Sequence, residues 1–468
     1  MAEGRWRVKA IEHLGDRNGE SGLKRSLGPI HLTLIGVGSI VGTGIFVLTG
    51  IGAERAGPGL ILAFVIAGFV CAMAALAFAE LASMIPVAGS AYTYTYATLG
   101  ELAAWIVGWC LILEYAIAAS AVAVGWSGYV TGWMNDAGWQ VPLVLSSGWF
   151  DGGILNLPAM FIACVVTLLL VVGTRESATV NAVLVVVKLA ALTLFVVFAA
   201  PHVEARNYQP FLPYGYGGVL SAASLIFFAY LGFDAISTAG EETRNPSRDL
   251  PLGIIGSLLV CTLIYMIVAA VSVGALPFET VMHSDEPLAF LVRALGHGTA
   301  GDLIAAGAII TLPTVIMVMI YGQTRIFFAM ARDGLLPPVF ARVHGKRGTP
   351  HVVTLATGAV ITVMAGIFPI EDITELSNAG TLLAFIVVSM AVLILRGTQP
   401  DRPRPFRCPA PLLVCGLAIL GCMVLFASLA ATTLVRFGVW VVIGLVVYYL
   451  YSGRRSPMRK PPAPTVAP

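Results

Sequence analysis

The sequence predicts an all-α integral membrane protein with twelve transmembrane helices, of which the first and the sixth are discontinuous. Three observations lead to this prediction. The chain of 468 residues is 58% hydrophobic and only 11% charged, whereas soluble globular domains carry about 25% charged residues. Its apolar residues gather in long runs, and two of these runs are interrupted by glycine and polar residues. A water-facing surface cannot be built from this composition, so most of the chain is expected to lie in lipid.

Twelve apolar runs are long enough to cross a bilayer, because a helix needs about 20 apolar residues to span a hydrocarbon core of roughly 30 Å. These runs lie at residues 29–51, 58–84, 100–130, 156–173, 178–200, 217–240, 250–274, 300–330, 351–369, 373–395, 411–431 and 433–451. Residues 1–28 are polar and form the predicted cytoplasmic N-terminal segment. Residues 452–468 are rich in Pro, Arg and Lys and form a predicted disordered cytoplasmic tail.

The distribution of Lys and Arg predicts which side of the membrane each connection faces, because cytoplasmic loops carry an excess of these residues. With the N-terminus inside, 22 of the 27 Lys and Arg residues fall in cytoplasmic segments and four fall on the other side. The remaining one, Lys188, lies within an apolar run. Both termini are then cytoplasmic, which requires an even number of crossings. We expect a multi-pass protein of the plasma (inner) membrane.

Several classes of function are disfavoured by what the sequence lacks. The net charge is +2 and the basic residues form no single cluster, so a nucleic-acid interface is not expected. No pair of histidines has the spacing of metal ligands, no Ser, His and acid set suggests a catalytic triad, and no Gly-x4-Gly-Lys loop is present. The seven cysteines form no CxxC motif. We therefore expect no enzyme, no metal site and no bound cofactor.

Four ionisable residues lie within apolar runs, where each is a candidate for function because charges are costly in a membrane. Glu80 is near the end of its run and could reach cytoplasmic water. Glu114 is at mid-run and requires a partner on another helix or a polar cavity. Asp234 lies within the sixth run, and Lys188 is flanked by valines. Loss of water disfavours the charged form of Lys188, which suits a group that takes up and releases a proton, whereas a permanent ion pair is the structural alternative.

The first apolar run contains four glycines within nine residues, namely Gly36, Gly38, Gly42 and Gly44. Each weakens a helix by roughly 1 kcal/mol relative to alanine. Non-helical backbone at membrane depth is tolerated only where it is buried in protein or lines a cavity. A close-packing face of small residues is the alternative explanation, since Gly38 and Gly42 are four residues apart.

The sixth run has a second interruption, with Gly232 and Asp234 at mid-span and a polar stretch at residues 241–246. Two interrupted helices at corresponding positions indicate a transporter built from inverted repeats. Residues 29–200 would form the first five-helix repeat and residues 217–395 the second. The second repeat is inverted because an odd number of helices precedes it, and residues 411–451 add helices 11 and 12.

Several motifs resemble those of the amino acid–polyamine–organocation permeases, and specifically their bacterial cationic amino acid transporter branch. The motifs are GVGSIVGTGIF at 36–46, AELA at 79–82, PVAGSAY at 86–92, FD at 233–234, EETRNP at 241–246, YGQTR at 321–325 and ARDGLLP at 331–337. The resemblance covers roughly residues 25–450. It implies a leucine-transporter-like fold of five plus five helices, with helices 1 and 6 discontinuous.

The resemblance also implies a binding site for an L-amino acid at the two helix breaks. Free N–H groups at Thr43 and Gly44 would bind the substrate carboxylate, and free carbonyls of the sixth helix would bind its ammonium group. Phe228 would close over the substrate as a gate. The implied site residues are Ile40, Gly42, Thr43, Gly44, Glu114, Phe228, Ala229, Leu231 and Met319.

Pocket size and charge favour different substrates. Met319 is bulky and apolar, which favours small neutral L-amino acids such as alanine. Glu114 could pair with a long basic side chain, so a transporter of arginine or lysine remains the alternative. An amino acid exchanger is a further possibility. A channel and a non-transporting membrane sensor are the alternatives of another class.

The resemblance implies coupling to protons. Residues 310–317 of helix 8 lack the adjacent hydroxyl pair that a sodium site of this fold would use. Lys188 matches a lysine that proton-driven relatives place against the helix 1 break, and would donate to carbonyls near Gly36 and Val37. Glu114 and Asp234 are lesser candidates for proton coupling. Expected partners are the amino acid substrate, protons and the lipid bilayer, with room for a bound lipid or sterol and for a small single-helix membrane subunit.

Overall fold

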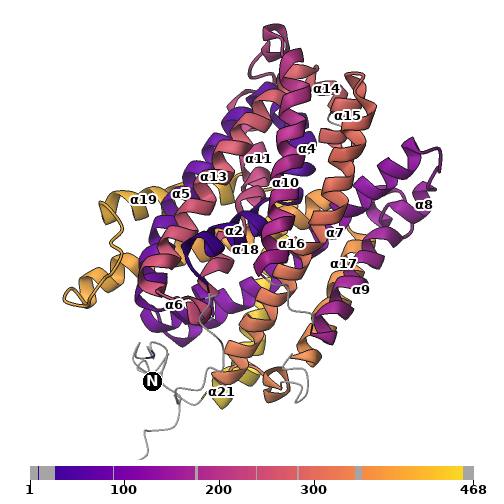
Figure 1. The fold of residues 1–468 in the computed structure, drawn as a ribbon. Helices are drawn as coiled ribbons and strands as arrows, with labels where there is room; N and C mark the ends of the chain where they lie inside the picture. Colours follow the sequence, from indigo (N-terminus) through magenta and orange to yellow (C-terminus); the bar gives the residue numbers. More distant parts are fainter. Residues whose placement is uncertain are drawn as a thin grey trace, which may run out of the picture.

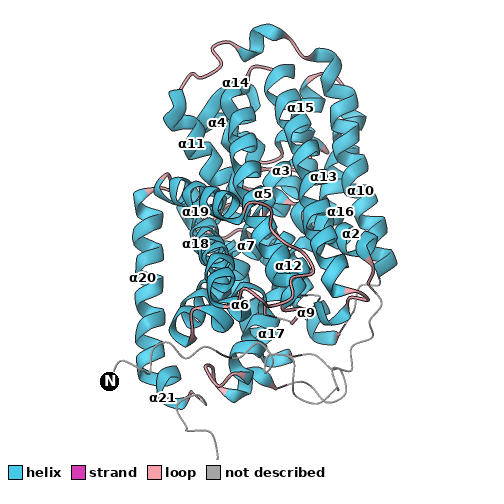
Figure 2. Ribbon diagram, turned by 90° about the vertical axis from the view of Figure 1, so that its left-hand side faces the viewer, coloured by secondary structure: helices cyan, strands magenta, loops and turns pink. Residues whose placement is uncertain are grey.

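The computed structural model describes residues 9, 27–87, 89–173, 178–238, 240–281, 284–342 and 350–456, whose regular structure is helical (Figures 1 and 2). The predicted N-terminal segment and C-terminal tail lie largely outside these residues. The helices are α2 (Pro29–Ile40), α3 (Thr43–Phe46), α4 (Leu48–Ala56), α5 (Leu60–Met84), α6 (Ser90–Thr98), α7 (Glu101–Asp136), α8 (Leu143–Ser146), α9 (Leu157–Val172), α10 (Ala178–Ala199), α11 (Gly215–Ile226), α12 (Phe233–Thr238), α13 (Pro246–Ala275), α14 (Phe278–Val281), α15 (Pro287–Ala294), α16 (Gly298–Arg332), α17 (His351–Ile367), α18 (Ile370–Thr398), α19 (Pro411–Ala427), α20 (Ala431–Val447) and α21 (Gly453–Arg455).

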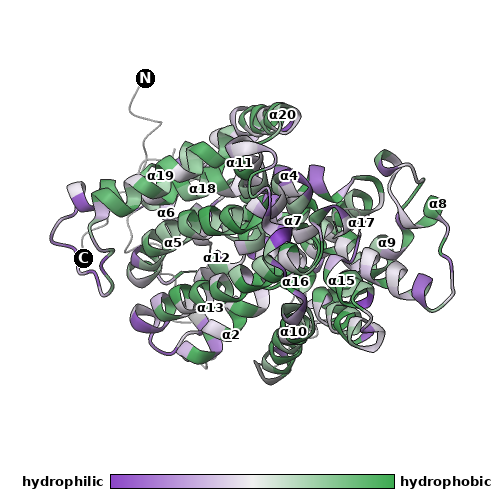
Figure 3. Cartoon of the chain, turned by 90° about the horizontal axis from the view of Figure 1, so that it is seen from above, coloured by the Kyte–Doolittle hydropathy of each residue, from purple (hydrophilic) through white to green (hydrophobic). Residues whose placement is uncertain are grey.

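The predicted all-α membrane class is confirmed. Eight helical segments of the described chain are long and apolar enough to cross a membrane, and α2, α9, α17 and α19 are shorter apolar helices. Together these segments overlap all twelve predicted apolar runs. Figure 3 shows hydrophobic residues along most of α5, α11 and α19. Twelve crossings and the inverted repeat remain predictions.

The helix of the first apolar run is interrupted at its glycines, as the sequence predicted. Helix α2 ends at Ile40, Val41 and Gly42 are extended, and α3 begins at Thr43. Close packing also requires some of these glycines, because a Cβ at Gly36 would lie 2.5 Å from the side chain of Ser257. The pair named for a packing face, Gly38 and Gly42, is also closely packed, since added Cβ atoms would lie 3.0 Å from Val185 of α10 and 3.3 Å from Val315 of α16. These two glycines face different helices and not one common partner.

The sixth apolar run is interrupted between α11 and α12. A short 3₁₀ turn, η5 (Phe227–Tyr230), follows α11, and Leu231 is then extended. Gly232 has φ +117°, a backbone conformation that is uncommon for residues with a side chain. A Cβ at Gly232 would also lie 2.9 Å from the Cβ of Ser39, so the two breaks pack directly against each other.

Long helices surround the two broken ones. Helix α7 packs along α16 and α18, while α5 packs along α13. Helix α10 contacts both α2 and α16, which brings Lys188 to the first break. Helix α20 stands at the edge of the bundle in Figure 2. The broken helices consequently lie inside a shell of continuous ones, where irregular backbone is shielded from lipid.

The expectation that Glu80 reaches cytoplasmic water is wrong. Its side chain is only 1% exposed, and its oxygens accept hydrogen bonds from Arg396 Nε at 3.1 Å and from the Cys408 amide at 2.7 Å. Arg404 lies 3.4 Å from the same carboxylate. Glu80 therefore ties α5 to the end of α18 and to the connection that follows it.

Four further buried carboxylates among the described residues were not singled out from the sequence, namely Glu101, Asp249, Glu286 and Glu375. Glu101 accepts a hydrogen bond from Tyr448 at 3.0 Å, and Glu375 accepts one from Thr433 at 2.9 Å. Both lie near the ends of apolar runs, where a charge is not unusual. The sequence therefore did not distinguish these buried side chains from exposed ones.

Replacing Glu80 with alanine should destabilise the folded protein. Loss of one partner from a buried ion pair leaves the other charge uncompensated, at a typical cost of about 3–5 kcal/mol. We expect roughly 3 kcal/mol, because the Arg396 side chain keeps 25% exposure. Unfolding of the purified protein in detergent measures this loss. Glu204→Ala is the control, since Glu204 and its partner Arg206 are exposed and should contribute little. Equal stability of the two variants would contradict the role given to Glu80.

Candidate functional site

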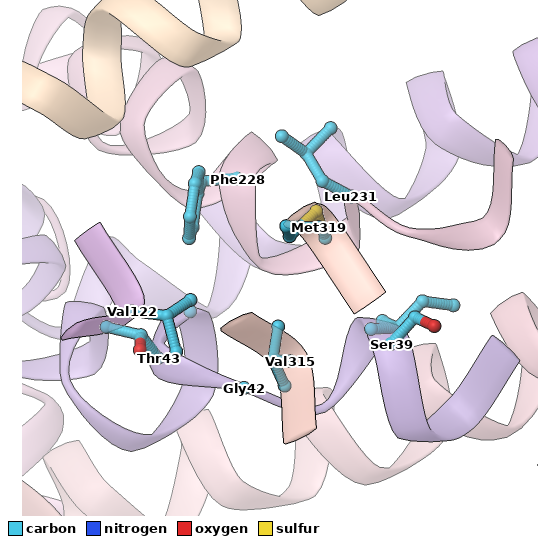
Figure 4. Close-up of a pocket in the computed structure, with 10 residues that line it drawn as sticks. Ser39, Gly42, Thr43, Val122, Phe228, Leu231, Val315 and Met319 are labelled. Atoms are coloured by element: carbon cyan, nitrogen blue, oxygen red, sulfur yellow. The ribbon is translucent and has the colours of Figure 1, made fainter. Parts of the chain in front are cut away.

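A small cavity lies between the two helix breaks (Figure 4). Its volume is about 10 Å³, roughly the space of one water molecule, so the two breaks are closely packed in this structure. The first break, the second break, α7 and α16 each contribute to its wall. The lining residues are Ser39, Ile40, Gly42, Thr43, Gly44, Val122, Phe228, Leu231, Val315 and Met319.

The start of α3 provides hydrogen-bond donors at this cavity. The amides of Ile45 and Phe46 both donate to the Gly42 carbonyl at 3.2 Å. The amides of Thr43 and Gly44 precede this first closed turn, and the first N–H groups of a helix have no partner within it. The Thr43 hydroxyl is also buried without a hydrogen-bond partner. A ligand with an anionic group could be bound by all three.

The second break has carbonyl oxygens at the opposite wall. The Phe228 carbonyl accepts the Leu231 amide at 3.1 Å, which closes the η5 turn and leaves one lone pair of that oxygen available. Figure 4 shows Phe228 and Leu231 across the cavity from Thr43. Donors on one wall and acceptors on the other match the two charged ends of a zwitterion.

Seven of the nine predicted binding residues line the cavity, and Glu114 and Ala229 do not. Ala229 instead packs behind it, because a Cβ at Gly44 would lie 2.2 Å from the Cα of Ala229. Glu114 lies eight residues from Val122 on α7, about 12 Å along the helix axis. Its carbonyl accepts the Ser377 hydroxyl of α18 at 3.3 Å.

Three lining residues were not predicted from the sequence, namely Ser39, Val122 and Val315. Ser39 immediately precedes the break, so its position next to the glycines was a usable signal. Val122 and Val315 are ordinary apolar residues of long helices. Only the rotation of α7 and α16 about their axes decides that these two face the cavity.

Side chains from neighbouring helices satisfy carbonyls that the first break leaves without helical partners. Lys188, which is fully buried, donates from Nζ to the Gly38 carbonyl at 2.6 Å. Tyr265 of α13 donates to the Ile40 carbonyl at 2.8 Å. Lys188 thus reaches the first break at Gly38, the residue next to the expected carbonyls of Gly36 and Val37.

Asp234 lies in the second half of the sixth run, at the start of α12. Its carboxylate accepts the Tyr115 hydroxyl at 2.8 Å. Glu114, the neighbour of Tyr115, has one carboxyl oxygen buried without a hydrogen-bond partner. These groups are therefore gathered between α7 and α12, beside the cavity rather than in its wall.

Both ends of the broken first helix are bound to other segments of the chain, by ion pairs at one end and by a backbone hydrogen bond at the other. At one end Arg55 of α4 contacts Glu371 at 2.9 Å and Glu375 at 2.6 Å, which joins α4 to α18. At the other end the Leu27 amide donates to the Glu242 carbonyl at 3.1 Å. The cavity therefore lies between two regions in which the broken first helix is bound to other segments.

A cavity at the meeting point of two broken membrane helices is typical of membrane transport proteins. Comparison with known proteins agrees with this class. A family model described as "Amino acid permease" matches residues 27–450. The chain therefore belongs to the amino acid permeases of the amino acid–polyamine–organocation superfamily.

Individual relatives carry different substrate names. The chain is 48% identical over 462 residues to the branched-chain amino acid permease BcaP of Bacillus subtilis, covering 97% of this chain and 99% of that one. It is 41% identical to the methylthioribose transporter of Bacillus subtilis, with the same coverage. It is 35% identical to human cationic amino acid transporter 4, covering 85% of this chain and 64% of that one.

Replacing Gly44 with valine should abolish substrate binding. The new side chain would collide with the backbone of Ala229 and force the two breaks apart. Equilibrium binding of labelled amino acid to the purified protein measures the loss. Gly438→Val on α20 is the control, since the space around Gly438 is open. Normal binding by the Gly44 variant would show that the carboxylate site lies elsewhere.

Proposed function

We propose that this protein is a secondary active transporter that takes up neutral L-amino acids together with protons. The observation that carries the proposal is the cavity between the two broken helices, with amide donors on one wall and carbonyl acceptors on the other. Transport would proceed by alternating access, in which the fastened ends on either side of the cavity release in turn. Uptake into sealed proteoliposomes, with and without an imposed pH gradient, tests this function.

Recognition of the amino acid would use mainly backbone groups. The amides of Thr43 and Gly44 and the Thr43 hydroxyl would bind the carboxylate. Carbonyls of Phe228 and Leu231 would accept hydrogen bonds from the ammonium group, with Phe228 covering the substrate, whereas the expected carbonyl of Ala229 belongs to a residue outside the cavity lining. Such contacts recognise the carboxylate and ammonium groups that all amino acids share. The side chains of the remaining cavity walls would then determine which amino acid binds.

The side-chain part of the cavity supports a neutral substrate. Val122, Val315 and Met319 are all apolar, and Glu114 lies outside the lining. A guanidinium or ammonium group placed against these residues would lose its hydration without a partner, which is costly. The name of the branched-chain permease relative also favours an aliphatic side chain, from alanine up to the branched chains. Arginine or lysine transport is the alternative, supported by the names of the cationic transporter relatives.

Lys188 would couple transport to protons. Its ammonium group fastens the Gly38 carbonyl of the first break, and a neutral amine would hold that carbonyl less strongly. Loss of the proton would then loosen the first broken helix and favour its movement. Glu114 and Asp234 remain lesser candidates, because both are buried carboxyls beside the cavity.

The proposed orientation places both termini in the cytoplasm of a plasma (inner) membrane protein with twelve crossings. Figure 1 shows α14 and α15 at one end of the molecule and α21 at the other. Arg293 lies on α15, while Arg454 and Arg455 lie on α21. The predicted outer and inner basic residues are thus at opposite ends, as the positive-inside rule requires.

Replacing Met319 with serine should widen the cavity and admit arginine while alanine still binds. The change removes apolar bulk from the wall and adds a hydroxyl that can accept a hydrogen bond. Competition of labelled alanine uptake by unlabelled arginine, in wild type and variant, measures the effect. Met423→Ser on the exposed face of α19 is the control. Strong arginine competition in the wild type would overturn the neutral-substrate assignment.

Replacing Lys188 with alanine should abolish accumulation driven by a pH gradient and leave substrate exchange in place. The substrate contacts are backbone groups, so exchange does not require the titrating amine. Lys188→Arg should also lose accumulation, because a guanidinium stays charged in proteins. Gradient-driven uptake and counterflow are measured in the same liposomes. If Lys188→Ala still accumulates substrate in response to pH, coupling belongs to another group, and a wild type driven by sodium would reject the proton assignment.

Flux measurements separate the alternatives of another class. A transporter saturates with substrate and accumulates it against a gradient, whereas a channel does neither. An exchanger moves labelled substrate only when substrate is present on the opposite side. A sensor without transport activity would bind amino acid but give no uptake under any gradient.

A further inference from the structure

A group of acidic residues surrounds one arginine at the end of the molecule remote from α21. Arg293 of α15 forms ion pairs with Asp136 at the end of α7, with Glu286 just before α15, and with Asp302 of α16. Asp285 adds a fourth carboxyl beside them. The proposed transport mechanism uses none of these groups.

Glu286 differs from the other carboxylates in its burial. Its side chain is 8% exposed, whereas Asp136 and Asp302 are 49% and 50% exposed. One of its oxygens contacts Arg293, and the other is buried without a hydrogen-bond partner. A buried carboxylate oxygen without a partner carries a desolvation cost that protonation removes.

The burial of Glu286 depends on a glycine face of α7. A Cβ at Gly132 would lie 2.3 Å from the Glu286 carboxyl, and a Cβ at Gly128 would lie 2.8 Å from the Asp285 Cβ. Gly128 and Gly132 are one helical turn apart, so they form a shallow seat for residues 285–286. The carboxyl can be buried only while this segment rests on α7.

This segment also approaches the substrate site. The Tyr129 hydroxyl of α7 donates to the Phe46 carbonyl at 2.8 Å, at the end of α3. The backbone of Leu288 faces the same Tyr129 hydroxyl. The seat of Glu286 and the amides proposed to bind the substrate carboxylate are therefore connected through one side chain.

We propose that Glu286 binds a proton from the outer solution and that this proton holds residues 285–294, which include α15, closed over α7. The statement that the proton comes from the outer side rests on the proposed function and orientation of the transporter. Glu286 adds an outer proton site that is separate from Lys188 and acts on closure of the outer face.

The sign of the effect follows from the environment of the carboxyl. Burial raises the pKa of Glu286 from 4.5 to about 7, Arg293 opposes this rise, and Asp136 and Asp285 add to it. Tyr129 of α7 also faces the carboxyl, and Asp302 of α16 acts through Arg293. A carboxyl that binds its proton more tightly when buried stabilises the closed arrangement as pH falls from about 7 toward 4.5. Above pH 7 this contribution is lost.

Hydrogen exchange of α15 in the full-length protein tests this inference without any transport assay. Between pH 8 and pH 6, a carboxyl with these two pKa values shifts an opening equilibrium by about tenfold. We therefore expect the amides of residues 287–294 to gain about tenfold protection at pH 6, after correction for intrinsic exchange. Glu286→Gln mimics the protonated side chain and should show equal protection at both values. Glu279→Gln, an exposed carboxyl of α14, should behave as wild type.

A second variant keeps the test informative if Glu286→Gln does not fold. Gly132→Ala should push the carboxyl out of its seat and move the midpoint of the pH dependence below 6. Protection of α15 that does not change with pH in the wild type would overturn the inference, as would an unchanged pH dependence in Glu286→Gln or an unchanged midpoint in Gly132→Ala. If hydrogen exchange of α15 depends on pH but the protein transports no amino acid, the proposed function is wrong and the proton site at Glu286 stands.

Discussion

The structure depends on how backbone polar groups are satisfied where two helices break inside a membrane. In lipid an unpaired carbonyl or amide destabilises the fold by several kcal/mol. A helix break is therefore stable only if other groups form hydrogen bonds with its backbone. Here three side chains donate hydrogen bonds to carbonyls of the first break: Lys188 to Gly38, Tyr265 to Ile40 and Tyr129 to Phe46. These contacts come from α10, α13 and α7, so the first break sets the positions of three long helices around it.

The same requirement explains why the cavity can bind a ligand. The carbonyls of the first break are largely occupied by side chains, whereas amides at the start of α3 and the Thr43 hydroxyl are not. An anionic ligand group completes this set. In the proposed binding mode backbone atoms bind the ligand, so the side chains of the walls can change without loss of the site. Relatives with the same family pattern and different substrate names are consistent with such a division.

One end of the cavity is held by ion pairs and the other by backbone hydrogen bonds. Arg55 joins α4 to α18 at one end, while the segment before α2 pairs with the segment after α12 at the other. Ion pairs near water are weak enough to exchange with solvent, so they suit contacts that must open and close. Glu286 belongs to this group of contacts, but its burial makes its charge depend on pH.

The sequence by itself determined the membrane class, the positions of the apolar segments and the two breaks, because lipid acts on each segment separately. Length, hydropathy and glycine content are local properties, and they located Gly42, Thr43 and Gly232 at the breaks. Only the tertiary structure decided that Val122 and Val315 face the cavity, that Glu114 does not, and that Glu80 is buried against Arg396. These outcomes depend on how each helix is rotated against its neighbours, and that rotation is set by contacts between residues far apart in the chain.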